Sequence, residues 1–263
     1  MADGHGSYGK NVSDFVIKSI GKNIDGSLKS VFEGAKMNAQ LVKSSDIKFK
    51  LSQCFSGADE KLQTESGINL KFSGTTCVTV LIVAAKIYCA NTGDSRAILA
   101  RASIQSSKEE RKMLALPLSR DHKGEDEDEY KRIIKAGGRV SSYVNTRGKP
   151  VGPLRVWHAL ENMPGLAMTR SFGDMEAHKV GVIATAEIKE VNMTLRDKFI
   201  IIGSDGIWEF ITNDEAIEIV MPHYEADDAE MACESLVEVA TERWRKYDAS
   251  IDDITCVIVF LNT

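Results

Sequence analysis

The chain has 263 residues and a mass of 28.9 kDa, with 43% hydrophobic and 27% charged residues. This balance is typical of a globular protein and excludes a wholly disordered chain. The 33 basic and 38 acidic residues give a net charge of −5, and the basic residues are scattered, so no nucleic-acid partner is expected. The longest apolar run, residues 78–85, is far shorter than the roughly 20 residues that cross a bilayer, so no membrane partner is expected either.

The five cysteines are odd in number, form no CxxC pair, and lie in part within apolar runs. This usage is typical of buried, reduced thiols in an intracellular protein. The first ten residues also lack the apolar core of a signal peptide. The sequence therefore predicts a cytoplasmic or nuclear protein.

The first part of the chain predicts helices followed by strands. Apolar residues at helical spacing predict one helix around 12–20 and a second around 27–39. Runs rich in Val and Ile then predict strands at 76–85, 86–91 and 96–101. An acidic start and a basic end predict a short helix over 124–137, which Gly137 and Gly138 end.

The second part begins with an irregular segment. Residues 139–165 contain several Pro and Gly, and a loop of this length in a compact chain is usually functional. Strands are predicted at 199–204 and 254–261, and helices at 213–220, with Asn213 as the cap, and at 227–246. Clustered strands and helices, without strict alternation, predict an α+β fold with a mainly antiparallel sheet core. We expect residues 1–263 to form a single domain.

An aspartate recurs at the ends of the predicted strands. Asp94 lies in GDSR, Asp205 follows an Ile-rich strand, and Asp252 and Asp253 precede the last strand, while Asp3 lies in ADGHG. Aspartates that converge repel one another unless a cation neutralises them, and oxygen ligands favour Mg²⁺ or Mn²⁺. Taken alone, Asp94 or Asp205 is more typical of an ordinary turn, and Asp252 and Asp253 are compatible with a solvated strand end. The spacing does not show that these residues meet, so the metal site and the structural interpretation both stay open.

Eight segments resemble the motifs of the PPM-type (type 2C) metal-dependent serine/threonine protein phosphatases, in the order of that family. They are ADGHGSYG at 2–9, SGTTCVTVLI at 73–82, NTGDSRAIL at 91–99, LSRDHKGEDEDEYKRIIKAGGRV at 118–140, RVW at 155–157, PGLAMTRSFGD at 164–174, IIGSDGIWEF at 201–210 and SIDDITCVIV at 250–259. Eight ordered matches over nearly the whole chain are a specific signal. The stretch from RVW to SFGD is most similar to plant and protist members.

The resemblance implies a β-sandwich of two mainly antiparallel sheets flanked by helices, with two Mg²⁺ or Mn²⁺ ions in a cleft at one end. By position, Asp3 would bridge the two ions, the carbonyl of Gly4 would bind one, and Asp205 and Asp252 would hold the other. His5 matches the general acid that protonates the leaving alcohol.

Three further assignments follow from the same resemblance. Asp94 matches an aspartate of a weaker third metal site, in which Glu209 stands where Asp is common. Asp253 replaces the commoner Asn and is expected to be a neighbour of the ligands. Residues 139–165 match the variable flap beside the cleft, which is linked to substrate choice.

The implied function is hydrolysis of phosphoserine and phosphothreonine in proteins by a metal-activated water, without a covalent enzyme intermediate. The alternative is a non-catalytic phosphatase-like domain that binds a phosphoprotein or another partner. Phosphorylated proteins are the expected partners, and a monomer is favoured.

The match begins late in the family pattern. Members have strands before DGHG that carry a phosphate-binding Arg and a Glu-Asp pair, whereas only Met1 and Ala2 precede Asp3 here. The resemblance therefore predicts a sandwich that lacks its first strands, through shortening of a longer protein or as a natural variant. It also predicts reduced activity for this chain alone.

Overall fold

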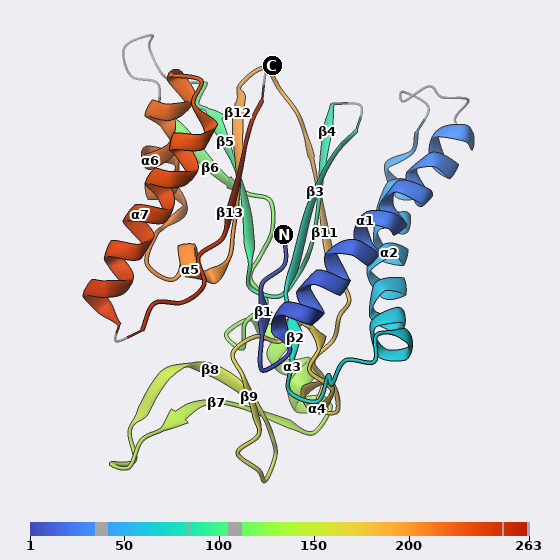
Figure 1. The fold of residues 1–263 in the computed structure, drawn as a ribbon, viewed down its shortest axis with the longest axis vertical. Helices are drawn as coiled ribbons and strands as arrows, with labels where there is room; N and C mark the ends of the chain where they lie inside the picture. The colour runs from blue at the N-terminus through green and yellow to red at the C-terminus, as the bar shows by residue number, and fades with distance from the viewer. Residues whose placement is uncertain (35–41, 84, 105–111, 249, 262–263) are drawn as a thin grey trace.

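Two antiparallel sheets stacked on each other form the centre of the molecule (Figure 1). The computed structural model describes residues 1–34, 42–83, 85–104, 112–248 and 250–261. The first sheet has the order β11-β4-β3 and consists of β3 (Cys77–Val83), β4 (Lys86–Thr92) and β11 (Glu187–Asn192). The second has the order β13-β12-β5-β6 and consists of β5 (Arg96–Ala102), β6 (Met113–Pro117), β12 (Asp197–Gly203) and β13 (Cys256–Phe260). The predicted α+β sandwich is thereby confirmed.

The interior between the sheets is filled by alternate residues of each strand, because successive side chains of a strand point to opposite faces. Val78, Ile87 and Cys89 of the first sheet pack with Leu99 and Ile200 of the second. As the sequence predicts, the cysteines are free thiols; Cys54, Cys77 and Cys89 are buried, and Cys233 and Cys256 are half-buried.

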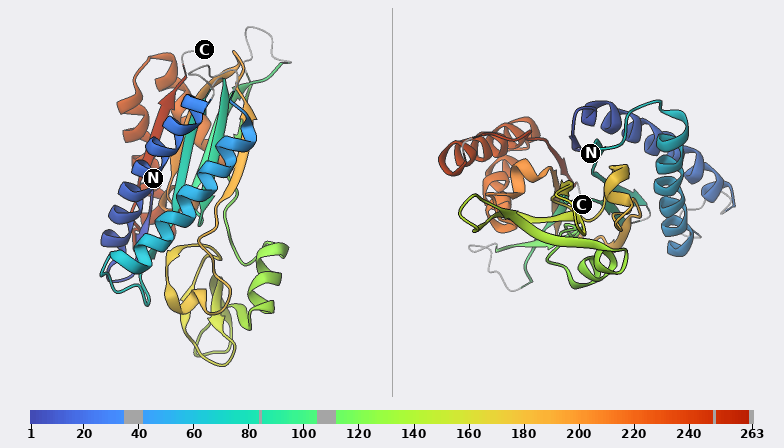
Figure 2. Two further views of the ribbon diagram at one scale, coloured as in Figure 1. Left: turned by 90° about the vertical axis from the view of Figure 1, so that its right-hand side faces the viewer. Right: turned by 90° about the horizontal axis from the view of Figure 1, so that it is seen from below.

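Pairs of helices cover the two outer faces. α1 (Gly9–Gly34) and α2 (Ser44–Glu65) cover the first sheet, and α6 (Asn213–Glu225) and α7 (Ala229–Tyr247) cover the second (Figures 1 and 2). α7 buries Ala232, Leu236 and Ala240 against β12 and β13, as its helical spacing predicts. No helix in the described ranges is both long and apolar enough to cross a membrane.

Several predicted helix boundaries are wrong. The two helices expected at 12–20 and 27–39 are one continuous helix as far as Gly34, and residues 35–41 lie outside the described residues. The cap of α6 is Thr212, not Asn213: its hydroxyl accepts from the Glu215 amide, and the Glu215 side chain accepts from the Thr212 amide. This reciprocal pair satisfies two amides that lack partners within the helix. The helix α2 and the strands β6 and β11 were not predicted.

The expectation of an irregular 139–165 segment is also wrong. These residues form a sheet of β7 (Gly138–Val144), β8 (Pro150–His158) and β9 (Pro164–Leu166), which follows α3 (Glu127–Lys135). The Gly and Pro that indicated a loop lie at the hairpin turn, where Gly148 has φ 74°, and in the β-bulge around Gly152, which has φ 73°. A bulge accommodates residues that a regular ladder excludes.

Candidate active site

A small three-stranded sheet gathers three distant segments at one end of the sandwich (Figure 1). β1 (Gly4–His5) and β10 (Phe172–Gly173) both pair with β2 (Gly74–Thr75) in antiparallel register. The backbone of Asp3 continues this pairing: its amide donates to Thr76 Oγ1 at 3.0 Å, and its carbonyl accepts from the Thr76 amide at 2.9 Å. Asp3 is therefore held by its own main chain.

Three more aspartates lie within electrostatic reach of Asp3 and come from other elements. Asp94 lies in the turn between β4 and β5, Asp205 begins α5 (Asp205–Trp208) and is separated from the end of β12 by a single residue, and Asp252 precedes β13. Contact between two of these segments depends on Gly206, since a Cβ there would lie 2.4 Å from the carbonyl oxygen of Asp253. We refer to Asp3, Asp94, Asp205 and Asp252 as the acidic cluster.

The carboxylates of the acidic cluster destabilise one another's charged forms. Burial, together with the charges of Asp205, Asp252 and Asp94 and a hydrogen bond with Asp205, raises the pKa of Asp3 to about 8. Burial and the charge of Asp205 raise the pKa of Asp94 to about 6. Burial and the charge of Asp252 likewise raise the pKa of Asp205. Such mutual repulsion is what a bound cation relieves.

The chemistry of the acidic cluster fits Mg²⁺ or Mn²⁺, because its donors are hard carboxylate oxygens. Among the described residues, however, no three acidic, histidine or cysteine side chains are already arranged as a metal-ligand set. Asp252 is exposed, and one of its carboxylate oxygens accepts from the Asp253 amide at 2.8 Å. Glu209 is also exposed, one turn after Asp205.

His5 contacts an aspartate that the sequence analysis did not assign. Its Nε2 lies 2.7 Å from Asp174 Oδ2, and the Asp174 side chain is 5% exposed. Burial lowers the pKa of His5, but the hydrogen bond and charge of Asp174 outweigh it, so the net shift is upward. Asp174 has φ 45°, and its amide donates to the Ser73 carbonyl, so the backbone directs this side chain towards β1.

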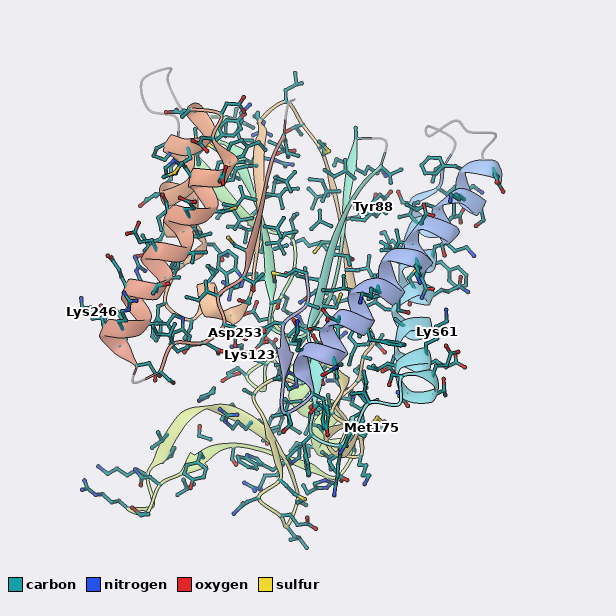
Figure 3. The ribbon with its side chains drawn as sticks, in the orientation of Figure 1. Lys61, Tyr88, Lys123, Met175, Lys246 and Asp253 are labelled. Atoms are coloured by element: carbon teal, nitrogen blue, oxygen red, sulfur yellow. The ribbon has the colours of Figure 1, made fainter. Side chains whose placement is uncertain are left out.

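Lys123 is the second residue that the sequence analysis missed. Its Nζ lies 3.6 Å from Asp94 Oδ2, and the side chain is 29% exposed. Figure 3 labels it at the end of the sandwich below α5. Both missed residues stand inside matched motifs, DHK and SFGD, which is the only signal that could have indicated them.

Comparisons with known proteins agree on one family. The sequence profile of "Protein phosphatase 2C" matches residues 2–247. The rice protein "Probable protein phosphatase 2C 64" is 34% identical over 262 residues, which cover 99% of this chain and 57% of the rice protein. The Arabidopsis thaliana protein "Probable protein phosphatase 2C 73" is 34% identical over 273 residues, covering 99% of this chain and 70% of that protein. The chain thus spans little more than half of the rice relative.

Two solved structures share the fold. A serine-threonine phosphatase 2C from Toxoplasma gondii superposes with a TM-score of 0.78 at 21% identity, over 98% of this chain and 83% of that one. A sex-determining protein of C. elegans superposes with a TM-score of 0.73 at 22% identity, over 98% of this chain and 55% of that one. At these identities the likeness concerns the fold alone.

Proposed function

The chain belongs to the protein phosphatase 2C family, and we propose that it hydrolyses phosphoserine and phosphothreonine esters of proteins with divalent metal ions held by the acidic cluster. The observation that carries the proposal is the convergence of four aspartates from separate segments, with the pKa of Asp3 raised to about 8. Carboxylates that are costly to ionise together form a strong site for a divalent cation.

The proposed ligands for two ions are Asp3, the Gly4 carbonyl, Asp205 and Asp252. Asp94 and Glu209 are proposed for a weaker third ion. Mg²⁺ or Mn²⁺ bound there would offset the charge of the phosphate ester and lower the pKa of a water molecule. Lys123 Nζ, 3.6 Å from Asp94, supplies part of the positive charge from the chain itself.

His5 is the proposed proton donor to the departing serine or threonine oxygen. Its hydrogen bond to Asp174 orients the imidazole and favours the protonated ring, which is the form that a general acid needs. The small sheet β1-β2-β10 fixes both residues, since His5 lies on β1 and Asp174 directly follows β10.

A non-catalytic domain that binds phosphoproteins remains the alternative function. The observation in its favour is that the described side chains contain no ready arrangement of three metal ligands. Binding of a phosphothreonine peptide in the presence of Mn²⁺, without release of phosphate, would support this alternative.

The deciding experiment measures phosphate release from a phosphothreonine peptide and from p-nitrophenyl phosphate with Mn²⁺, with and without EDTA. Asp205→Asn keeps the side-chain shape but removes one charge, and we expect kcat to fall about 10²-fold or more. The matched control is Asp227→Asn, at an exposed position with φ 55° that Asn tolerates; it should keep full activity. Turnover that survives exhaustive chelation would contradict the proposal.

A further inference from the structure

The hairpin of β7 and β8 has a charge opposite to that of the rest of the chain. Residues 138–158 contain four basic residues, Arg139, Arg147, Lys149 and Arg155, and no Asp or Glu. Since the whole chain has 33 basic and 38 acidic residues, the remainder carries 29 and 38, a net charge of −9 against +4 for the hairpin. The hairpin is therefore a projecting element with a net positive charge in a chain whose remainder is net acidic.

These four cations are not neutralised by carboxylates within the described part of the chain. Arg139 donates to Ser141 Oγ and lies over the Trp157 ring, and Arg155 donates to the Gly165 carbonyl at 2.8 Å. Arg147 and Lys149 are exposed at the tip. By contrast, the basic residues Arg96, Arg101, Arg120, Arg132, Arg170 and Arg243 each form an ion pair with an Asp or Glu.

The tip that carries Arg147 and Lys149 is an ordered turn. Asn145 Oδ1 accepts from the Arg147 amide at 2.9 Å and from the Lys149 amide at 3.0 Å. The Asn145 amide donates to the Lys149 carbonyl at 2.9 Å, and Gly148 takes a positive φ. The two side chains therefore project from a defined backbone, which lowers the entropy lost on binding.

Exposed apolar side chains accompany the charges. Tyr143, Val144 and Val151 are 60%, 54% and 50% exposed, on the two strands next to the turn. A surface that is basic and partly apolar, with an aromatic ring, is complementary to an acidic peptide that also carries apolar residues.

The hairpin begins beside the acidic cluster and leads away from it. A Cβ on Gly124 would lie 2.6 Å from Val140 Cγ1 and 3.4 Å from Leu154 Cβ, so the base of the hairpin packs next to Lys123. Figures 1 and 2 show the hairpin as a ribbon at this end of the sandwich, projecting away from the two main sheets. At about 3.3 Å per residue, the five steps from Val140 to Asn145 span roughly 17 Å.

We propose that the β7–β8 hairpin is a docking arm for acidic residues of the substrate protein that lie some distance from the phosphorylated residue. An extended peptide advances about 3.3–3.6 Å per residue, so the distance along the hairpin backbone corresponds to about five residues of substrate, and the long side chains of Arg147 and Lys149 extend this reach by about two residues more. The expected effect on kcat/KM rests on the proposed phosphatase function, whereas binding of the acidic peptide by the hairpin does not.

Binding is tested first, by fluorescence anisotropy in EDTA, so that no turnover is required. A labelled unphosphorylated peptide with a cluster of glutamates is compared with its glutamine counterpart. Arg147→Gln/Lys149→Gln should weaken binding of the acidic peptide about 3- to 10-fold, the scale of two exposed ion pairs, and the difference should shrink in about 0.5 M salt. Unchanged binding by this variant would overturn the proposal.

The matched control is Lys22→Gln/Lys61→Gln, which makes the same charge change at exposed positions on α1 and α2, the latter labelled in Figure 3. It should bind like the parent. If both double variants weaken binding equally, net charge and not the hairpin is responsible, which contradicts the proposal. A single-stranded oligonucleotide is tested in the same way. If it binds more tightly than the acidic peptide and loses affinity in the hairpin variant, the hairpin binds nucleic acid, which overturns the proposal.

The kinetic experiment uses phosphothreonine peptides that carry three glutamates on either side of the phosphothreonine. The glutamates are placed either one to three or five to seven residues from the phosphothreonine. The distal placement should have the higher kcat/KM, through KM, and only this advantage should vanish in Arg147→Gln/Lys149→Gln. The rate on p-nitrophenyl phosphate should stay unchanged. Hydrolysis without any distal preference overturns the docking arm but leaves the phosphatase function intact. Hairpin-dependent binding of the acidic peptide without any hydrolysis supports the docking arm and contradicts the phosphatase function.

Discussion

At the scale of single residues, the candidate site depends on side chains that approach one another only because particular backbone atoms allow it. Asp174 reaches His5 across β2, where Gly74 leaves the space: a Cβ at Gly74 would lie 2.0 Å from Asp174 Oδ2 and 2.5 Å from the Phe172 carbonyl oxygen. The first atom belongs to a side chain that could move, but the second belongs to the backbone. Both β10 and the His5–Asp174 contact therefore depend on the absence of a side chain at position 74.

We expect Gly74→Ala to lower the free energy of unfolding by roughly 1–3 kcal/mol, the range of overpacked sites, and to reduce activity as well. Thermal melting and kcat on p-nitrophenyl phosphate measure the two effects. Gly21→Ala is the control, because its Cβ would meet no atom within 4 Å; in the middle of α1 it should stabilise the protein by up to about 1 kcal/mol. Equal melting temperatures of the two variants would show that the backbone around β2 accommodates the added methyl group, which would contradict this prediction.

His5→Ala should affect substrates according to their leaving groups. The rate on a phosphothreonine peptide should fall about 10²-fold or more, because the alcohol needs a proton, whereas p-nitrophenolate leaves as a stable anion and should lose much less. Asp174→Asn keeps the shape but removes the charge beside His5, so it should show the same pattern more weakly. His223→Ala, on α6, is the control and should change neither rate. Equal losses on both substrates would remove His5 from the role of general acid.

At the scale of elements, one buried carboxylate connects the helix α3 to the segment that precedes β10. Glu129 is fully buried and accepts hydrogen bonds from Arg132, Arg170 and Thr169. Burial by itself raises the pKa of Glu129, but these hydrogen bonds outweigh it and lower the pKa to about 2. Because Thr169 and Arg170 lead into β10, the network holds the strand that positions Asp174.

Glu129→Gln should lower the free energy of unfolding by about 3 kcal/mol at pH 7, because two arginines lose a buried partner. The folded-state pKa is below the ordinary value of 4.5, so the charged Glu129 stabilises the protein fully above about pH 4.5 and loses this effect as the pH falls towards 2. Denaturant melts from pH 7 downwards should show the parent and the variant converging. Glu127→Gln, exposed on the same helix, should differ little from the parent throughout. A parent–variant gap that is independent of pH would contradict this account.

At the scale of the whole molecule, the two sheets bring the ends of several strands to one edge, and the acidic cluster lies there. Asp94 and Asp205 follow β4 and β12, Asp252 precedes β13, and Asp3 precedes β1. A ligand that joins these segments binds the folded chain and not the unfolded one, so it must stabilise the fold.

Mn²⁺ should therefore raise the melting temperature, by several degrees at about 100 times its dissociation constant, where the added free energy is about 2.7 kcal/mol. Asp205→Asn should remove most of this shift, and Asp227→Asn should retain it. Equal shifts in both variants would place the stabilising ion elsewhere on the protein.

The sequence alone determined the features that depend on neighbouring residues or on ordered motifs. Periodic apolar residues indicated α7, and Val- and Ile-rich runs indicated β3, β4, β5, β12 and β13, since a helix face or a buried strand is a local pattern. The order of eight motifs indicated the family, and through it the members of the acidic cluster. That these aspartates lie within electrostatic reach of one another agrees with the expectation, whereas their roles as ligands stay predictions.

Only the tertiary structure decided the contacts between distant segments. His5 and Asp174 are 169 positions apart, and neither residue's surroundings in the sequence indicate the other. The sequence does not predict the strands β7 and β8, because their Gly and Pro residues locally indicate a loop. These residues are tolerated in a bulge and a turn, which form only when the two strands pair. Strand pairing and contacts such as that of His5 with Asp174 depend on the segments that pack against each other, so they form only once the chain has folded.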